Sequence, residues 1–304
     1  MLYVTDAQVR DVLQWDDLIA AMEDALAALS CGHVVQPLRS WLTVAPEKFW
    51  GVMPAAAKDA MGIKLVSFYP QNAAEGLPTV LATVVLFDRA TGEPLAAMDA
   101  RTLTAMRTAA VSAAATKLLS APDSKVLALL GSGAQAQSHL EALSRVRKFE
   151  EIRVWSRTRA HAQRFAEQFG AIAMDAESAV RGADVVVAAT PAQSPILKGA
   201  WLKRGAHVNS IGAPMPAWRE LDDEAMANPV VVEARDAALH ESGDIILSHT
   251  QIHAELGELI AGTKTLDAAR TTIFKSVGVA IEDVAAARLV FDAVSRAARG
   301  SGAG

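Results

Sequence analysis

The stretch "VLALLGSGAQAQSHLEAL", residues 126–143, decides the fold class of this chain. It starts as an unbroken apolar run, passes through Gly-Ser-Gly-Ala-Gln-Ala and continues with apolar residues at helical spacing. This order predicts a buried strand, a tight turn and a helix. The turn, residues 131–136, fits the G-x-G-x-x-A pattern of dinucleotide sites, whose phosphates lie at the helix N-terminus. A glycine turn can also serve packing alone, but the strand before it and the helix after it favour a dinucleotide site.

The end of the next predicted strand indicates which dinucleotide is bound. Folds that prefer NAD usually carry an acidic residue there, which holds the ribose hydroxyls. This chain has Ser156-Arg157-Thr158 instead. Arg157 can pair with a 2′-phosphate, and the two hydroxyls can donate to it. We therefore expect NADPH as the preferred cofactor with NADH possible; the alternative is a solvated arginine on an ordinary loop.

The rest of the chain divides into two regions with different patterns of predicted strands and helices. Residues 39–88 contain short runs rich in β-branched and aromatic residues, which predict several strands, and residues 102–119 form an alanine-rich helix. After Pro122 the pattern changes to alternating apolar strands and helices, which is typical of a doubly wound parallel sheet. We expect an α/β protein with one domain over residues 1–119 and a Rossmann-type domain over residues 120–279.

Composition limits the function classes. Of 304 residues, 51% are hydrophobic and 21% charged, and the net charge of -5 argues against a nucleic-acid or anionic-membrane surface. Cys31 is the only cysteine, which excludes an internal disulfide, and the first residues lack a secretory pattern, so we expect a cytoplasmic protein. His249 and His253 have metal-ligand spacing on a predicted amphipathic helix, but no third ligand is evident and no metal is expected.

Several motifs together resemble the ornithine cyclodeaminase/mu-crystallin family, and most closely its ketimine reductase branch. They include "GIKLVSFYP" (62–70), "MRTAAVSA" (106–113), "GSGAQA" (131–136), "GAHVNSIGA" (205–213) and "TIFKSVGVAIEDVAAARLV" (272–290). The resemblance covers nearly the whole chain. It implies a substrate-binding and dimerisation domain, to which the C-terminal helix (280–304) returns, beside a nucleotide-binding domain. It also implies a homodimer whose N-terminal domains share a closed β structure.

The resemblance also implies roles for individual residues. Arg39 and Lys64 would line the substrate pocket, and Arg107 would lie between substrate and cofactor. The implied cofactor-binding residues are Thr79, Gly131, Ser132, Gly133, Ala134, Gln135, Ser156, Arg157, Thr158, Thr190 and Ser276, with Thr79, Thr190 and Ser276 near the nicotinamide.

Three cations in half-buried segments suggest the substrate's charge. Unpaired buried cations are costly, so Arg39, Lys64 and Arg107 predict an anionic ligand, unless each pairs with a nearby acid such as Asp88 or Asp99. We expect the α-carboxylate of an imino acid, with hydride delivered to the carbon of its C=N bond. Lys64 is the candidate to deliver a proton, because burial lowers a lysine pKa, but it can equally serve only to bind carboxylate.

The leading hypothesis is NAD(P)H-dependent reduction of a cyclic ketimine such as pyrroline-2-carboxylate or piperideine-2-carboxylate. The alternatives are an alanine-type amino-acid dehydrogenase, an ornithine cyclodeaminase and a non-catalytic NADPH-binding protein. Pro214 disfavours cyclodeamination, because cyclodeaminases carry an aspartate at that place in the family pattern. We expect no nucleic-acid or membrane partner.

Overall fold

The computed structural model describes residues 1–267 and 269–301, and the chain forms two compact units. One unit contains Met1–Arg107 together with the C-terminal helix, and the other is Thr108–Gly278. The division therefore falls inside helix α3 (Arg101–Leu119), twelve residues before the boundary expected from the sequence. The reason is packing: Ser112 and Thr116 on the last turns of α3 bond to His139 and Asn209 of the second unit. Pro122 marks the end of the helix, not the edge of a packing unit.

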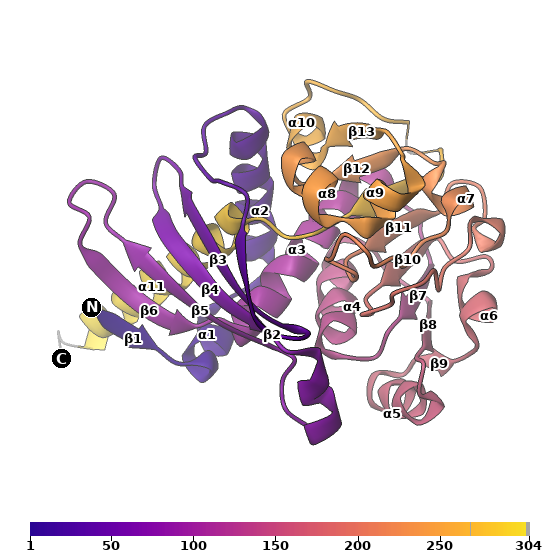
Figure 1. Ribbon diagram of the computed structural model, residues 1–304, viewed down its shortest axis with the longest axis horizontal. Coiled ribbons are helices and arrows are strands. Elements are labelled where there is room, and N and C mark those ends of the chain that lie inside the picture. Colours follow the sequence, from indigo (N-terminus) through magenta and orange to yellow (C-terminus); the bar gives the residue numbers. More distant parts are fainter. Residues whose placement is uncertain (268, 302–304) are drawn as a thin grey trace. The chain divides into compact units, whose positions relative to one another are not determined.

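The first unit is a six-stranded sheet with helices on one side (Figure 1). The strands have the order β1-β6-β5-β4-β3-β2, and all neighbours are antiparallel except β1 and β6. The elements of this unit are β1 (Leu2–Val4), α1 (Asp6–Val12), α2 (Trp15–Ser30), β2 (Ser40–Ala45), β3 (Lys48–Ala56), β4 (Met61–Phe68), η1 (Pro70–Glu75), β5 (Val80–Phe87), β6 (Pro94–Asp99) and α11 (Ala280–Ser301). The expected return of the C-terminal helix is observed for the described residues, since α11 packs on α2, β3, β4 and β5.

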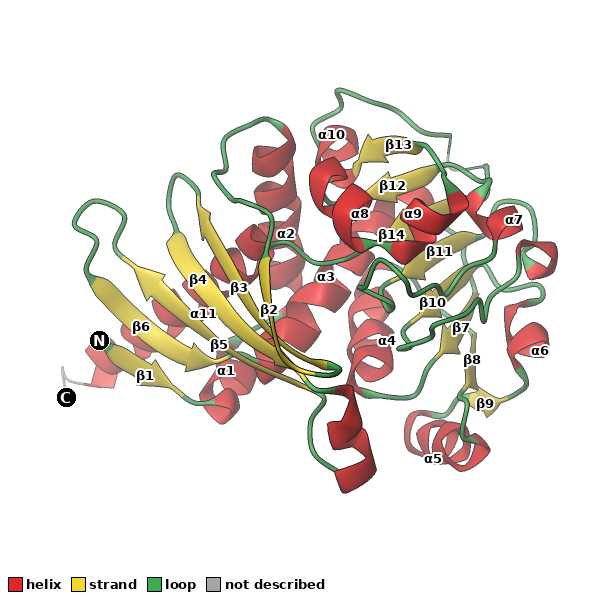
Figure 2. Ribbon diagram, in the orientation of Figure 1, coloured by secondary structure: helices red, strands yellow, loops and turns green. Residues whose placement is uncertain are grey.

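Burial alternates along the strands of this sheet, as expected for a half-covered sheet. On β4, Gly62, Lys64 and Val66 are buried, while the intervening side chains are only half-buried. Figure 2 shows α1, α2 and α11 on one side of the sheet. The helices therefore cover the face that carries Lys64.

The second unit is an eight-stranded parallel sheet of the doubly wound type, which confirms the expected fold class. The strand order is β13-β12-β14-β11-β10-β7-β8-β9. Six of these strands, β9-β8-β7-β10-β11-β14, reproduce the Rossmann order 3-2-1-4-5-6, with β7 as the first strand. The direction of winding therefore reverses between β7 and β10, where such folds bind dinucleotides.

Helices and loops connect the strands of the second unit. Its elements are β7 (Val126–Leu130), α4 (Ala134–Val146), β8 (Glu151–Trp155), α5 (Arg159–Phe169), β9 (Ile172–Ala173), α6 (Ala176–Val180), β10 (Val185–Ala188), η2 (Gly199–Trp201), β11 (His207–Ser210), α7 (Asp223–Met226), β12 (Val230–Val232), α8 (Arg235–Glu241), α9 (Gly243–Ser248), β13 (Ile252–Glu255), α10 (Leu256–Ile260) and β14 (Thr272–Lys275). The central strands β7 and β10 are almost wholly buried, which explains their unbroken apolar sequences.

One local prediction is wrong. The segment after His249 was expected to be an amphipathic helix, but Ile252–Glu255 forms β13 and pairs in parallel with β12. His249 ends α9 in the left-handed conformation, at φ 54°, so the helix cannot continue through it. His249 and His253 therefore do not share one helix face. Within the described residues, no helix is long and apolar enough to cross a membrane.

Candidate functional site

The glycine turn has the geometry of an anion cradle. Gly131 has φ 127°, and a Cβ on it would lie 2.5 Å from the carbonyl oxygen of Ala189, so only glycine fits between β7 and the end of β10. Gly133 precedes α4 as its N-cap, offers no side-chain bond to the helix, and would carry a Cβ into open space. Ala136 is buried against the sheet. The first backbone N–H groups of α4 thus face a free approach, which fits a pyrophosphate.

Ser156 and Arg157 lie where the second strand of the Rossmann order ends. Both line a hollow of about 620 Å³ beside β8, together with Arg159, Met174 and Asp175 among others. Arg157 is exposed, and Thr158 is the N-cap residue of α5 with no side-chain cap bond. Two arginines in the wall make the hollow suitable for a phosphorylated ribose.

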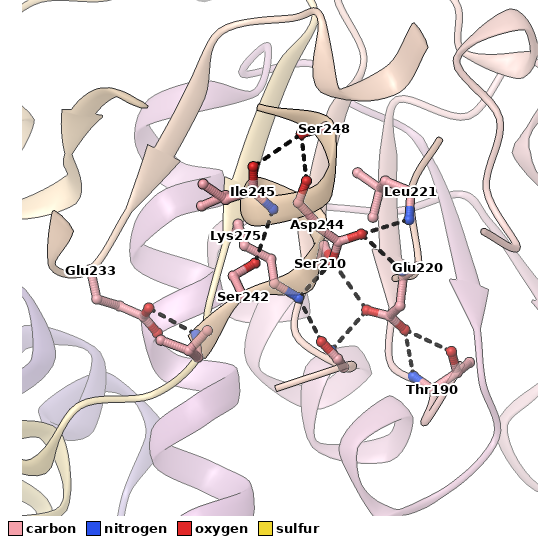
Figure 3. A network of polar contacts seen from close by, with 12 residues as sticks. Thr190, Ser210, Glu220, Leu221, Glu233, Ser242, Asp244, Ile245, Ser248 and Lys275 are labelled. Atoms are coloured by element: carbon pink, nitrogen blue, oxygen red, sulfur yellow. Dashed lines mark hydrogen bonds and ion pairs between the residues drawn. The ribbon is translucent and has the colours of Figure 1, made fainter. Parts of the chain in front are cut away.

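Thr190 and Ser276 lie at the same carboxyl edge of the sheet as the glycine turn, and each is held by a buried glutamate. Figure 3 shows Thr190 beside Glu220. The backbone N–H and the hydroxyl of Thr190 both donate to Glu220 Oε1, at 2.7 Å each. The hydroxyl of Ser276 donates to Glu233, whose carboxylate also accepts from the backbone N–H groups of Val277 and Gly278. Neither role could be recognised from sequence spacing, because Glu220 lies 30 residues from Thr190 and Glu233 lies 43 residues from Ser276.

In the first unit, two of the three candidate cations meet on one carboxylate. Lys64 on β4 is 2% exposed, and its Nζ lies 2.6 Å from Asp283 Oδ2. Arg107 donates from Nε to Asp283 Oδ1 at 2.9 Å and from Nη1 to Glu282 Oε2 at 2.6 Å. Glu282 and Asp283 occupy the first turn of α11 and are fully buried. We call Arg39, Lys64, Arg107, Glu282 and Asp283 the charge cluster.

The acids that pair with these cations are not the ones considered from the sequence. Asp99 binds Arg101, and Asp88 accepts from backbone N–H groups of its own turn. The sequence pattern of Glu282 and Asp283 is typical of acids that stabilise a helix N-terminus, so it carried no sign of a distant partner. Their pairing with Lys64 and Arg107 could be found only from the fold.

The pKa of Lys64 is lowered to about 8. Burial is the largest cause, and the positive charges of Arg107 and Arg39 act in the same direction, while Asp283 opposes them. Burial alone would raise the pKa of Asp283, but Arg107 and Lys64 hold it below its usual value. The ion pairs join two cations, Lys64 and Arg107, to two carboxylates, Glu282 and Asp283. Arg39 adds a positive charge close enough to lower the pKa of Lys64.

Two further predicted residues of the first unit are Arg39 and Thr79. Arg39 is half-buried, and its guanidinium lies 5.5 Å from the centre of the Trp41 ring. Thr79 comes just before β5, and its carbonyl accepts from the N–H of Tyr69. Val84 is the strand partner of Lys64, so Thr79 lies five residues away along β5, roughly 16 Å. The structure does not bring Thr79 to Lys64 within this chain.

Two buried histidines support the second unit without titrating near neutral pH. Burial lowers the pKa of His139 to about 4 and that of His207 to about 3. His139 contacts the carbonyl of Gln135 at 2.7 Å and the hydroxyl of Ser112 at 2.9 Å, so it ties the start of α4 to α3. Among the described residues, no three His, Cys, Asp or Glu side chains gather as a metal site requires.

Comparison with known proteins agrees with this geometry. The model of the ornithine cyclodeaminase/mu-crystallin family matches residues 2–298. The chain is 47% identical over 304 residues to a ketimine reductase mu-crystallin of Mus musculus, covering 96% of this chain and 97% of that protein.

Two solved structures are also similar along their whole length. One is Delta(1)-pyrroline-2-carboxylate reductase of Thermococcus litoralis in complex with NADH and L-proline, with 36% identity, 98% of both chains covered and a TM-score of 0.94. The other is an archaeal alanine dehydrogenase dimer with bound NAD, with 35% identity, 97% of both chains covered and a TM-score of 0.91.

Proposed function

The chain belongs to the ornithine cyclodeaminase/mu-crystallin family, and on that basis we propose that it reduces the C=N bond of an α-imino acid with a nicotinamide dinucleotide. The observation that carries the proposal is the charge cluster, in which Asp283 holds the buried side chains of Lys64 and Arg107 together. A cyclic ketimine such as pyrroline-2-carboxylate or piperideine-2-carboxylate combines the required carboxylate and C=N bond.

Residues of the second unit would hold the cofactor. The turn from Gly131 to Gln135 would bind the pyrophosphate through backbone N–H groups at the start of α4. Ser156, Arg157 and Thr158 would surround the adenosine ribose. Because Arg157 can pair with a 2′-phosphate, we propose NADPH as the preferred cofactor and NADH as a possible one.

Thr190, Ser276 and Thr79 would lie near the nicotinamide. Thr190 follows β10, which pairs with β7 next to the glycine turn, and Ser276 follows β14, two strands further along the sheet. Since Thr79 is far from Lys64 along β5, a role for Thr79 fits better if it acts in a site other than the one formed by Lys64 of its own chain.

The charge cluster would bind and protonate the substrate. Arg39 and Arg107 would hold the α-carboxylate, because a guanidinium can bind a carboxylate through two parallel hydrogen bonds. When bound, the reduced nicotinamide supplies the hydride that adds to the imine carbon. Lys64 would hold a proton at Nζ and deliver it to the imine nitrogen, because a pKa of about 8 keeps it mostly protonated at neutral pH but able to lose the proton. Asp283 orients that ammonium group.

We also propose a homodimer formed through the uncovered face of the first sheet. Leu42, Trp50 and Leu81 are exposed on this face, and the strand register places them in neighbouring positions. Half-buried Val52 and Leu65 lie beside them. An apolar face of this kind on a sheet commonly marks an interface. The single cysteine fits a reducing compartment, and the proposal includes the cytoplasm as the location.

Two other functions of the same fold remain as alternatives. An alanine-type dehydrogenase would use the same hydride chemistry with pyruvate and ammonia. A non-catalytic NADPH-binding protein would bind cofactor and never consume it. Ornithine cyclodeamination is disfavoured, because Pro214 has no ionisable group to act on the amine.

A substrate panel separates these functions. NADPH and NADH absorbance at neutral pH would be followed with pyrroline-2-carboxylate, with piperideine-2-carboxylate and with pyruvate plus ammonia. The proposal expects fast oxidation with a cyclic imine and little with pyruvate. The reverse pattern would establish an amino-acid dehydrogenase, and tight cofactor binding without any oxidation would favour the non-catalytic alternative.

A further inference from the structure

Glu220 joins the ends of two neighbouring strands through one buried carboxylate (Figure 3). Its Oε1 accepts from the N–H and the hydroxyl of Thr190, which follows β10. Its Oε2 accepts from the N–H of Gly212 at 2.8 Å and from the hydroxyl of Ser210 at 3.1 Å, at the end of β11. The carboxylate of Glu220 thus accepts four hydrogen bonds, two at each oxygen.

A second pair of buried charges completes the network. Lys275 on β14 donates to the carbonyl of Gly212 at 2.5 Å, and its Nζ lies 2.9 Å from Asp244 Oδ2. Asp244 Oδ1 accepts from the N–H groups of Glu220 and Leu221, at 2.9 Å each. The contacts therefore run in a closed ring from Glu220 to Gly212, Lys275, Asp244 and back to Glu220.

This network is costly for a purely structural element. Glu220, Asp244 and Lys275 are all fully buried, so two carboxylates face one ammonium group. Removing charges from water costs free energy that their mutual attraction often does not recover, and well-packed apolar side chains can replace such groups without loss of stability. Buried charges with this cost indicate that the loops they contact must keep a fixed conformation.

The loop that Glu220 holds is itself strained. Ala213 adopts φ 51°, which is unfavourable for a residue with a Cβ, and its N–H donates to the carbonyl of Thr190 at 3.2 Å. Gly212 approaches the same carbonyl so closely that no Cβ fits there. Backbone strain of this kind persists only where the surroundings fix it, and it is concentrated at functional sites.

We propose that Glu220 is a positioning residue that fixes Thr190 and the 212–213 loop as one wall of the nicotinamide pocket. The inference rests on the proposed function, which brings the nicotinamide to this edge of the sheet. The wall is built from the carboxyl ends of β10 and β11, next to the glycine turn that would hold the pyrophosphate. Glu220 would thus fix the position of the nicotinamide ring through Thr190 and the 212–213 loop. The glycine turn would bind the pyrophosphate without a contribution from Glu220.

Glu220→Gln tests this role with little change in volume. The glutamine oxygen can still accept from Thr190, but its NH₂ group then faces the N–H of Gly212, so two donors meet and the loop loses its anchor. Glu224→Gln is the matched control, since Glu224 is exposed on α7 four residues away. Ser210→Ala, which removes one donor to Oε2, is the second variant if Glu220→Gln does not fold.

The decisive readout compares two dissociation constants. NADPH and 2′-phospho-ADP-ribose, which lacks the nicotinamide, would be titrated by calorimetry into full-length wild type and variants. In Glu220→Gln we expect the Kd of NADPH to rise about tenfold, while the Kd of the fragment stays within about twofold of wild type. The kcat of imine reduction should fall about 100-fold, because a small misplacement of the ring slows hydride transfer. Ser210→Ala should move both quantities in the same direction by less, and Glu224→Gln should match wild type.

Two results would overturn the proposal. Loss of NADPH and fragment binding in equal proportion would show that Glu220 only stabilises the unit as a whole. Unchanged binding of both ligands would show that the wall does not depend on Glu220. Failure of wild type to reduce any imino acid would count against the proposed function instead. The ratio of the two dissociation constants would still show whether Glu220 positions the nicotinamide.

Discussion

The carboxylate of Asp283, on the last helix, lies 2.6 Å from the ammonium group of Lys64, on the fourth strand. Both groups are almost wholly buried, and 219 residues separate them in sequence. This pair makes the chemistry of Lys64 depend on Asp283. The carboxylate opposes the fall in the lysine pKa that burial causes, and it leaves that pKa at about 8.

The first prediction concerns the pH dependence of reduction. If protonated Lys64 supplies the proton, kcat/KM for the imine should fall as pH rises through about 8, where Lys64 loses its proton. The reverse reaction, oxidation of the amino acid, needs Lys64 in its neutral form, so its rate should rise over the same pH range. Steady-state rates in both directions from pH 6 to 10 test this, and a reduction rate independent of pH through this range would remove Lys64 from the proton transfer.

Asp283→Asn should move that pH profile to lower pH. Because Asp283 raises the pKa of Lys64 by its charge and its hydrogen bond, neutralising it should lower the apparent pKa by about one unit or more. Glu282→Gln is the control, since Glu282 pairs with Arg107 and not with Lys64. Circular dichroism would establish that both variants are folded. An unshifted profile in folded Asp283→Asn would contradict the coupling.

Lys64→Met should reduce turnover severely and leave cofactor binding intact. General acid catalysis contributes about 10²- to 10⁴-fold, so kcat should fall by a factor in this range. Lys58→Met, at an exposed position in the turn before β4, is the control and should behave as wild type. Near-normal kcat in Lys64→Met would mean that another group delivers the proton.

Arg157→Asp should exchange the cofactor preference. Loss of one charge-assisted contact to the 2′-phosphate should lower kcat/KM with NADPH about 10- to 100-fold, while the new carboxylate can accept from the ribose hydroxyls of NADH. Arg164→Asp, exposed on α5 outside the hollow, serves as the control for the change of charge. If the ratio of the two kcat/KM values stays as in wild type, Arg157 does not select the cofactor.

Acid should destabilise the protein through its buried histidines. The pKa of His139 is lowered by burial to about 4 in the folded state, against 6.5 for an ordinary histidine, so the unfolded chain binds the proton more readily. The stabilising contribution is complete above pH 6.5 and is lost as pH falls toward 4, by about 3 kcal/mol for this group. Urea unfolding of wild type and His139→Gln across this range should show the steeper loss in wild type. If the free energy of unfolding falls equally with pH in both proteins, His139 is excluded as the cause.

Trp50→Glu should separate the proposed dimer. A charge at the centre of the uncovered sheet face would be buried against the partner at a cost that the interface cannot recover. Light scattering after gel filtration should show wild type as a dimer and the variant as a monomer. Leu239→Glu, at an exposed apolar position in the second unit, should remain dimeric. A monomeric wild type would rule out the dimer at the concentrations measured.

The parallel sheet was predictable because its signals are local. Apolar runs such as residues 126–130 are interrupted by a glycine turn, and strand, turn and helix follow within eighteen residues. The unit boundary was less predictable. A proline marks where helix α3 ends, but the packing of Ser112 and Thr116 decides to which unit the last turns belong.

The partners of the buried charges could not be predicted from the sequence. Asp283, Glu282 and Glu220 lie in segments where acids normally stabilise a helix start or face solvent. Arg107 and Asp283 are 176 residues apart, and Glu220 binds Thr190 across 30 residues. The prediction of a helix after His249 was wrong for a related reason, because strand pairing with β12 overrides the helical spacing of its apolar residues.

The most direct test of the account is to follow the hydride. Reduction of pyrroline-2-carboxylate or piperideine-2-carboxylate with NADPH carrying deuterium at both positions of nicotinamide C4 would be analysed by mass spectrometry and NMR. The account predicts one deuterium in each molecule of the product amino acid, on the α-carbon, and loss of this product in Lys64→Met. Unlabelled product, or label at any other carbon, would contradict direct hydride transfer to the C=N bond.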